Sequence, residues 1–428
     1  MTVSPKEPQL FLQALEKLYV KKLPHWPLRS ISAGAWKNFS QMGLPTKKWE
    51  AFQYLPLQQM YRFLPKGQES TANAAAVKMP QGISLLVKDG SFCPELSQTS
   101  ALPKEVVVLP LSKAMGIYGT ILANRMQKLQ QEEKNPFALV NQAIEQEGIF
   151  IYVPPHIEVK DSVSIYYTAE SGQAVFPKVQ IFMGKGASMK ISVSCHSKED
   201  SWTNALMDIS LDEGASLTRC FSALPNASSP WIFESVRAAL KRDSRFHSYS
   251  LTSGSKTVRE DLAVALEGEN AEADLKGIWM LGESRQSHTH ILVAHRAPYC
   301  RSNQHFKGVN ASASKSSFEG KIYVKAKAQK TEGYQLNNNL LLSKKAEANA
   351  KPNLEIFADD VKASHGATIS KLNEEELFYL KTRGLSLADA ASYLVKGFCR
   401  EILQQMPDRS MRESGEKILN EIIRHGLD

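Results

Sequence analysis

The chain has 428 residues, of which 43% are hydrophobic and 22% are charged, and its formal net charge is +8. This length exceeds one ordinary compact core and predicts two or three domains or one elongated solenoid, and the composition excludes an intrinsically disordered protein. Lys and Arg are interspersed with Asp and Glu and form no array with aromatic residues, which argues against a nucleic-acid-binding surface.

The cysteines and the N-terminus bear on the cellular compartment. None of the five cysteines forms a Cys-x-x-Cys pair, which is typical of a reducing compartment, and we expect Cys195 and Cys399 to be buried and inert. Pro5, Glu7 and Pro8 interrupt the N-terminal apolar residues, and no run reaches the ~20 residues of a membrane span. We therefore expect no signal peptide, no membrane contact and a cytoplasmic location.

Residues 1–147 are predicted to form a mainly helical region with a few strands. Apolar residues recur at three- and four-residue spacing in the first twenty residues and again in 112–145. Short apolar runs at 83–87 and 106–109 predict strands. Residues 68–80, rich in small side chains, predict a linker.

Residues 148–367 are predicted to form the core of the protein, because the hydrophobic period changes to two. Apolar and polar residues alternate along 189–195, and the Gly-Ala-Ser of 186–188 recurs 28 residues later at 214–216. A looser echo follows at 268–271. Repeats of this length predict the coils of a stacked β-solenoid.

Residues 368–428 return to helical spacing and predict a C-terminal helical module. Asn373 with Glu376 resembles a capping box, Gly384 is suited to end that helix, and Ser386 is suited to begin the next. The apolar face of this second helix is predicted to comprise Leu387, Ala390, Leu394, Phe398 and Ile402. A last helix follows at 418–423. Such a module can cover the open end of a solenoid, present a face to a partner, or do both.

The segment 328–368 carries a resemblance to a known family. Its motifs QLNNNLLLS, KPNLEIFADDV and SHGAT resemble the SufB/SufD family of iron–sulfur cluster assembly proteins. The resemblance is dense from about 280 to 405 and sparse before 150, apart from the opening GLPTKKWE at 43–50, which is similar to the SufD branch. It implies a right-handed parallel β-helix flanked by two helical regions.

The same resemblance implies a site. His365 of the Ser-His-Gly motif would lie at the interface with SufB, where it cooperates with a SufB cysteine in building the nascent cluster as a shared metal ligand. The motif predicts that His365 lies in a turn, and the alternative is a histidine that only caps that turn. Ala363 stands where the family often has a cysteine, so a thiolate from this chain is not expected.

Other residues are candidates with open alternatives. Glu355, Asp359 and Asp360 are suited to assist iron entry, and equally suited to satisfy backbone donors in turns. By the resemblance, Arg383 and Gly384 lie in the helical surface that docks the ATPase SufC, although this is also the cationic end of a helix.

A histidine-rich segment contains His288, His290, His295, His305 and Cys300. Histidines two residues apart on a strand face the same way, as the ligands of a zinc or iron site must. The segment lacks an acidic residue or second cysteine at ligand spacing. We therefore favour hydrogen bonding between neighbouring coils as the role of these histidines.

The predicted function is that of a SufD-like scaffold subunit, not an enzyme, in a SufB–SufC–SufD complex that assembles iron–sulfur clusters. No phosphate-binding Gly-x-x-x-x-Gly-Lys-Ser/Thr run is present, so ATP hydrolysis is expected of SufC. We expect no tightly bound cofactor and a transient cluster at the SufB–SufD interface, and the sequence leaves open whether the isolated chain forms a homodimer. The sequence leaves open whether a flavin associates with the complex.

Two alternatives are weighed against this function. The first is a SufB-like primary scaffold, against which the opening at 43–50 and the lack of a suitable cysteine near the last coils both argue. The second is a β-helix carbohydrate-active enzyme, which usually has an export signal and acidic residues clustered on one coil face.

Overall fold

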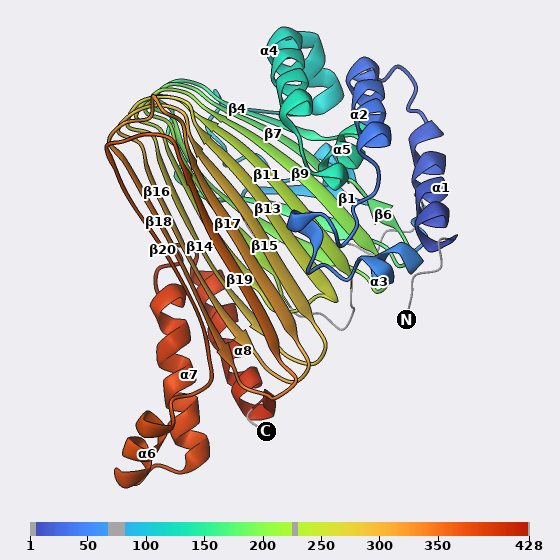
Figure 1. Cartoon of the computed structure of the whole chain (residues 1–428). Helices are drawn as coiled ribbons and strands as arrows, with labels where there is room; N and C mark the ends of the chain where they lie inside the picture. The colour runs from blue at the N-terminus through green and yellow to red at the C-terminus, as the bar shows by residue number, and fades with distance from the viewer. Residues whose placement is uncertain (1–5, 67–81, 225–229, 427–428) are drawn as a thin grey trace.

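The computed structural model describes residues 6–66, 82–224 and 230–426, so the predicted linker at 68–80 lies outside the described residues. Its centre is a parallel β-solenoid in which each turn of the chain adds one strand to each of two facing sheets (Figure 1). The stacked β-architecture predicted from the period of two is confirmed.

The two sheets differ in which strands they contain. Neighbouring strands pair in parallel except at β1–β2 and β3–β4, which are antiparallel. Sheet I contains, in spatial order, β2 (Ser91–Phe92), β1 (Ser84–Lys88), β5 (Val163–Ala169), β8 (Ser188–Ser197), β10 (Ser216–Ala223), β12 (Arg245–Thr252), β14 (Glu272–Leu281), β16 (Arg301–Asn310), β18 (Thr331–Leu341) and β20 (Val361–Ser370). Sheet II contains β3 (Val107–Pro110), β4 (Ile149–Val153), β7 (Lys178–Met183), β9 (Trp202–Leu211) with β6 (Ala174–Val175) beside it, β11 (Trp231–Leu240), β13 (Thr257–Leu266), β15 (Gln286–His295), β17 (Lys315–Val324) and β19 (Glu347–Ile356).

The N-terminal helices cover the outer face of sheet II. Trp202, Trp231 and Phe233 of the sheet pack with Phe52 and Phe137 in one buried cluster. The helical segments of this region are α1 (Lys6–Val20), α2 (Arg29–Met42), η1 (Glu50–Phe52), α3 (Leu57–Arg62), η2 (Pro94–Leu96), α4 (Leu111–Glu132) and α5 (Pro136–Ala143). The strands predicted at 83–87 and 106–109 are present as β1 and β3, and β1 pairs with β5 so that this region contributes to sheet I.

One corner of the solenoid explains the repeat seen in the sequence. A residue in each turn there has positive φ, and these residues are His156, Gly186, Gly214, Asp243, Asn270, Tyr299 and Lys330. Each backbone N–H donates to a carbonyl of the next turn, as from Gly186 to Glu213 at 2.8 Å and from Gly214 to Arg242 at 2.9 Å. Glycine adopts this conformation without strain, which accounts for the recurring Gly-Ala-Ser.

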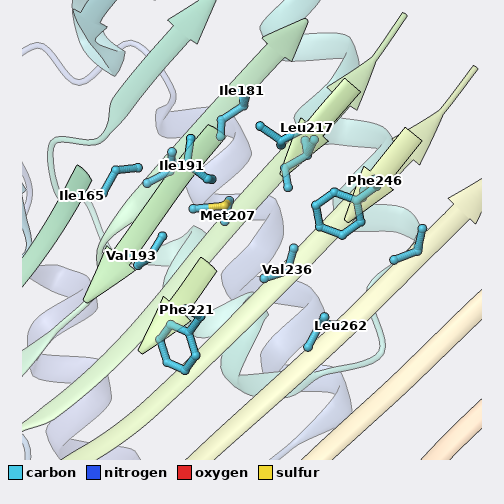
Figure 2. Packing of buried hydrophobic residues seen from close by; sticks show 14 of the residues in the cluster. Ile165, Ile181, Ile191, Val193, Met207, Leu217, Phe221, Val236, Phe246 and Leu262 are labelled. Atoms are coloured by element: carbon cyan, nitrogen blue, oxygen red, sulfur yellow. The ribbon is translucent and has the colours of Figure 1, made fainter. Parts of the chain in front are cut away.

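The space between the sheets is filled mainly by aliphatic side chains. Figure 2 shows Ile165 and Ile191 of sheet I with Ile181 and Met207 of sheet II in this interior cluster. Each fully buried aliphatic side chain stabilises the fold by about 1.5–3 kcal/mol. Because one residue in two faces inward, strand register determines which side chains share the interior.

The C-terminal helices are α6 (Glu374–Thr382), α7 (Leu387–Leu403) and α8 (Arg409–Gly426). Helices α7 and α8 pack against the outer face of sheet I at β14 and β16, in a cluster with Ile278 and Val309. They lie beside the solenoid rather than across its end (Figure 1). Among the described residues, no helix is long and apolar enough to cross a membrane.

The predicted apolar face of α7 is partly wrong. The helix buries Ala391, Val395 and Cys399 together with the predicted Ala390 and Ile402, whereas the predicted Leu387 is 58% exposed. The buried face also includes Leu403, because contact with sheet I, and not hydrophobic spacing alone, decides which side of α7 is buried. Cys399 is packed, as predicted, and Cys195 is buried in the solenoid core.

Candidate functional site at the open end of the solenoid

The last coil of the solenoid is open. Strands β19 and β20, which the structure describes in full, end their sheets, and every residue in them is exposed or half-buried. Earlier strands bury at least one face. An uncovered strand edge presents unpaired backbone donors and acceptors, which are suited to pairing with another chain.

His365 lies on this edge strand. The turn predicted around it is wrong, because the chain turns at 357–360 and β20 then pairs with β18 over ten residues. The register places His365 beside Gln335, which in turn lies beside Gln304 of β16. These three residues form an inward-facing column whose first two members are buried and whose last, His365, is exposed. The imidazole therefore lies at the mouth of the solenoid interior.

Neither β18 nor β20 contains a cysteine that could accompany this imidazole. Ala363 occupies the neighbouring inward position on β20, and its register partner is Gly333. Cys300 and Cys399 are fully buried, and burial raises the pKa of Cys300 to about 11 and that of Cys399 to about 12. These cysteines are protonated at neutral pH and are not available as metal ligands.

The predicted carboxylates do not converge on His365. Glu355 faces the outside of sheet II and pairs with Lys321 at 3.1 Å, Asp360 pairs with Lys330, and Asp359 is exposed. Five residue-to-residue steps of extended chain lead from Asp360 to His365, which is about 17 Å at 3.3 Å per step. Carboxylates at the corner therefore cannot ligate an ion that His365 holds.

The histidine-rich segment forms hydrogen bonds within the solenoid, as favoured from the sequence. His288 bonds Ser317 of the next coil at 2.8 Å, and His295 bonds Ser302 at 2.8 Å. Burial lowers the pKa of His288 to about 3 and that of His295 to about 4, so both imidazoles are neutral. In the part of the chain that the structure describes, no three His, Cys, Asp or Glu side chains group closely enough to hold a metal ion.

Helices α6 and α7 carry an exposed aromatic surface. Phe378 and Tyr393 are each 69% exposed, and the Arg383 guanidinium lies 5.1 Å from the ring centroid of Tyr379. Gly384 has a φ of 91° and ends α6, as its sequence position predicts. The predicted helix starts are also confirmed, since Asn373 and Ser386 cap α6 and α7 through their side chains.

Sequence analysis missed an ion cluster inside the solenoid. Arg219 of β10 faces inward and pairs with Glu234 at 2.5 Å, and with Glu260 at 3.6 Å. All three are buried. The available signal was a charged residue at an apolar position of the period-two pattern, between Leu217 and Phe221.

These features define a parallel β-solenoid protein with an open terminal coil and a helical module beside it. Comparison with known proteins matches residues 9–165 to the SufBD protein N-terminal region and residues 166–398 to the SUF system FeS cluster assembly, SufBD core domain. The chain therefore belongs to the SufBD family of iron–sulfur cluster assembly proteins.

Individual relatives include both named and general members of this family. An iron–sulfur cluster assembly SufBD family protein of Synechocystis is 30% identical, covering 89% of this chain and 87% of its own length. The iron–sulfur cluster assembly protein SufD of Escherichia coli is 26% identical over 87% of each chain. Protein ABCI7, chloroplastic, of Arabidopsis thaliana is 30% identical over 61% of this chain and 58% of its own.

Proposed function

We propose that this chain is a SufD-type subunit of a cytoplasmic SufB–SufC–SufD complex that assembles iron–sulfur clusters. In this role it does not hydrolyse ATP itself and pairs with a SufB-type paralogue through its β-solenoid. Support comes from family membership, from the opening at 43–50, and from a SufD relative that spans 87% of both chains.

The observation that carries the proposal is an exposed imidazole on an open strand edge. His365 by itself cannot make a metal site, and among the described residues it belongs to no group of three or more His, Cys, Asp or Glu side chains that could hold a metal ion. A strand of the SufB-type paralogue that pairs with β20 can supply the missing thiolate. Iron and sulfide are then the substrates that meet at the interface between β20 and that strand, which we call the seam. Neutral imidazole is suited to ferrous iron.

The absence of an available thiol favours the SufD-type over the SufB-type role. A primary scaffold needs a cysteine near the last coils, whereas the two cysteines that follow Cys220 are both fully buried. In the proposed division of labour this chain contributes the imidazole and its paralogue contributes the sulfur ligand.

The exposed aromatic surface of α6 and α7 is the proposed docking site for the ATPase SufC, with Arg383 and Gly384 at the end of α6 beside it. ATP-driven closure of two SufC subunits would then move these helices. Because α7 and α8 are packed on sheet I, the motion passes to the stacked strands and opens the seam at His365. Parallel ladders of backbone hydrogen bonds make the solenoid rigid enough to transmit this motion.

Glu355, Asp359 and Asp360 are proposed to assist iron entry, but at positions away from His365. Their two ion pairs are exposed to solvent, so both are weak and each carboxylate can exchange its lysine for a metal cation. These carboxylates are suited to bind ferrous iron before it reaches the seam, and they are not ligands at the seam itself.

The test is His365→Ala in the complete complex, co-expressed with its SufB and SufC partners in cells that depend on this system. We expect the complex to assemble normally and cluster formation to fall at least tenfold, measured as iron and sulfide content and as growth. Ser364→Ala, on the outer face of the same strand, is the matched control. Full cluster assembly by His365→Ala would remove the proposed role.

A further inference from the structure

The inward-facing column at the mouth of the solenoid contains a buried acceptor without a donor. Gln335 is 3% exposed, and its Nε2 donates to Oε1 of Gln304 at 3.2 Å. Its own Oε1 is buried and has no hydrogen-bond partner among the described residues. A buried carbonyl left unpaired loses the hydrogen bonds that water gives it in the unfolded chain, so this atom calls for a donor.

The register shows which residue can provide that donor. Gln335 pairs with His365 across β18 and β20, so the two side chains leave their strands on the same, inward side. Neighbouring strands are about 4.8 Å apart, within reach of a glutamine and a histidine side chain. The other neighbour in the column, Gln304, already accepts from the amide nitrogen of Gln335 through its Oε1, and its own buried Nε2 does not donate to the Gln335 oxygen.

We infer that Gln335 is a positioning residue for His365: its side-chain carbonyl accepts the imidazole N–H and holds the ring in one tautomer. This inference rests on the proposed function, in which His365 contributes a ligand at the seam. Because the amide nitrogen of Gln335 donates to Gln304, its oxygen is the atom left to accept from His365.

The chemical consequence follows from the imidazole itself. A neutral imidazole has one N–H and one lone pair, and a carbonyl oxygen only accepts. The nitrogen that bonds Gln335 is therefore the protonated one, and the lone pair of the other nitrogen is left for iron. Metal-binding histidines commonly have such a partner, and its loss typically lowers metal affinity 10–100-fold.

The test reads the tautomer directly, without metal and without turnover. Protein labelled with ¹⁵N-histidine is observed by NMR at about pH 8.5, where ordinary histidines are neutral, and the His365 signals are assigned by their loss in His365→Ala. We expect one tautomer to exceed 90% in the natural protein, and a mixture with at least 30% of the other in Gln335→Met. Gln335→Asn, which withdraws the acceptor by one methylene, should give a similar mixture if Gln335→Met does not fold.

Two further variants separate positioning from general damage. Asn337→Leu removes another buried, inward-facing amide of β18, which bonds the Phe306 carbonyl instead, and it should leave the His365 tautomer unchanged. Gln335→Glu keeps an acceptor at the same reach and should restore the single tautomer.

The outcomes distinguish this inference from the function on which it rests. Unchanged ¹⁵N shifts of His365 in both Gln335→Met and Gln335→Asn would overturn the positioning role, whatever the cluster assays give. Altered shifts, combined with normal cluster assembly by His365→Ala, would support the contact and overturn the proposed function. In the complete complex, Gln335→Met should also lower the iron content at least threefold while Asn337→Leu does not.

Discussion

A single guanidinium shared by two carboxyl groups lies inside the solenoid. Arg219 pairs with Glu234 and Glu260, and one positive charge cannot neutralise both. Burial raises the pKa of Glu234 to about 7 and also raises the pKa of Glu260. The protonated form of a carboxyl group is therefore favoured here over much of the acidic range.

The raised pKa of Glu234 makes stability depend on pH. Because the folded protein holds this proton up to about pH 7 and the unfolded chain releases it near pH 4.5, stability is full below pH 4.5 and falls as pH rises through 7. We expect Glu234→Gln to flatten the decline in thermal midpoint between pH 5 and 7.5, measured by calorimetry. Glu213→Gln, an exposed control, should keep the natural slope, and an unchanged slope in Glu234→Gln would contradict the assignment.

The motif around His365 predicts part of the candidate site but not its geometry. The Ser-His-Gly motif identifies the residue by resemblance, whereas its strand conformation and inward direction come from the register with β18. Asp359 and Asp360 are close to it in sequence and about 17 Å or more away along the extended strand. Closeness in sequence therefore does not bring Asp359 and Asp360 together with His365 as ligands of one metal ion.

Helices α6 and α7 expose side chains that a purely structural module would bury. Phe378 and Tyr393 are each 69% exposed, and Leu387 is 58% exposed. The opposite side of α7 accounts for its packing on sheet I, so the exposed side is not needed for folding. Exposed aromatic groups of this kind are typical of binding surfaces.

We expect the double variant Phe378→Ser, Tyr393→Ser to lose SufC-type ATPase binding by at least thirtyfold. The reason is that buried aromatic anchors commonly contribute 2 kcal/mol or more each to an interface. Titration calorimetry measures the affinity, and the thermal midpoint should stay within about 1 °C. Tyr299→Asn is the control, because Tyr299 is 56% exposed at a solenoid corner and asparagine suits its positive φ. Unchanged affinity in the double variant would exclude this surface.

The local signals for these helices were read correctly from the sequence. Asn373 and Ser386 cap α6 and α7, and Gly384 ends α6 in the left-handed conformation. Caps depend on residues three or four positions apart, which the sequence displays. The buried face of α7 depends instead on the surface it meets, and there the predicted face was partly wrong.

Across the whole molecule, a row of alternating charges follows the outer face of sheet I to the open end. Arg245, Glu272, Arg301, Glu332 and Lys362 occupy matching positions on five successive strands. Glu332 forms ion pairs with both neighbours, at 3.6 Å from Arg301 and 3.7 Å from Lys362. The row stops on a cation at the uncovered edge. A partner strand that continues it would present a carboxylate there.

We therefore expect Lys362→Glu to weaken pairing with the SufB-type paralogue. Exposed ion pairs are weak, so the expected change in affinity is about two- to fivefold at 0.1 M salt and vanishes at 0.5 M. Analytical ultracentrifugation or interferometry at the two salt concentrations measures it. Lys190→Glu, on β8 far from the open end, is the control. A loss that persists at high salt would show that the effect is not electrostatic.

The sequence by itself determined the features that repeat or act over a few residues: the period-two strands, the 28-residue recurrence, the helix caps and the family motif around His365. Each depends on backbone conformation or on neighbours along the chain, so the order of residues displays it. Tertiary structure alone decided which side chains share the interior, that Arg219 meets Glu234 across two sheets, that α7 and α8 lie beside the solenoid, and that Gln335 stands next to His365. These depend on register between strands about 30 residues apart, and a shift of one residue would direct every such side chain to the opposite face.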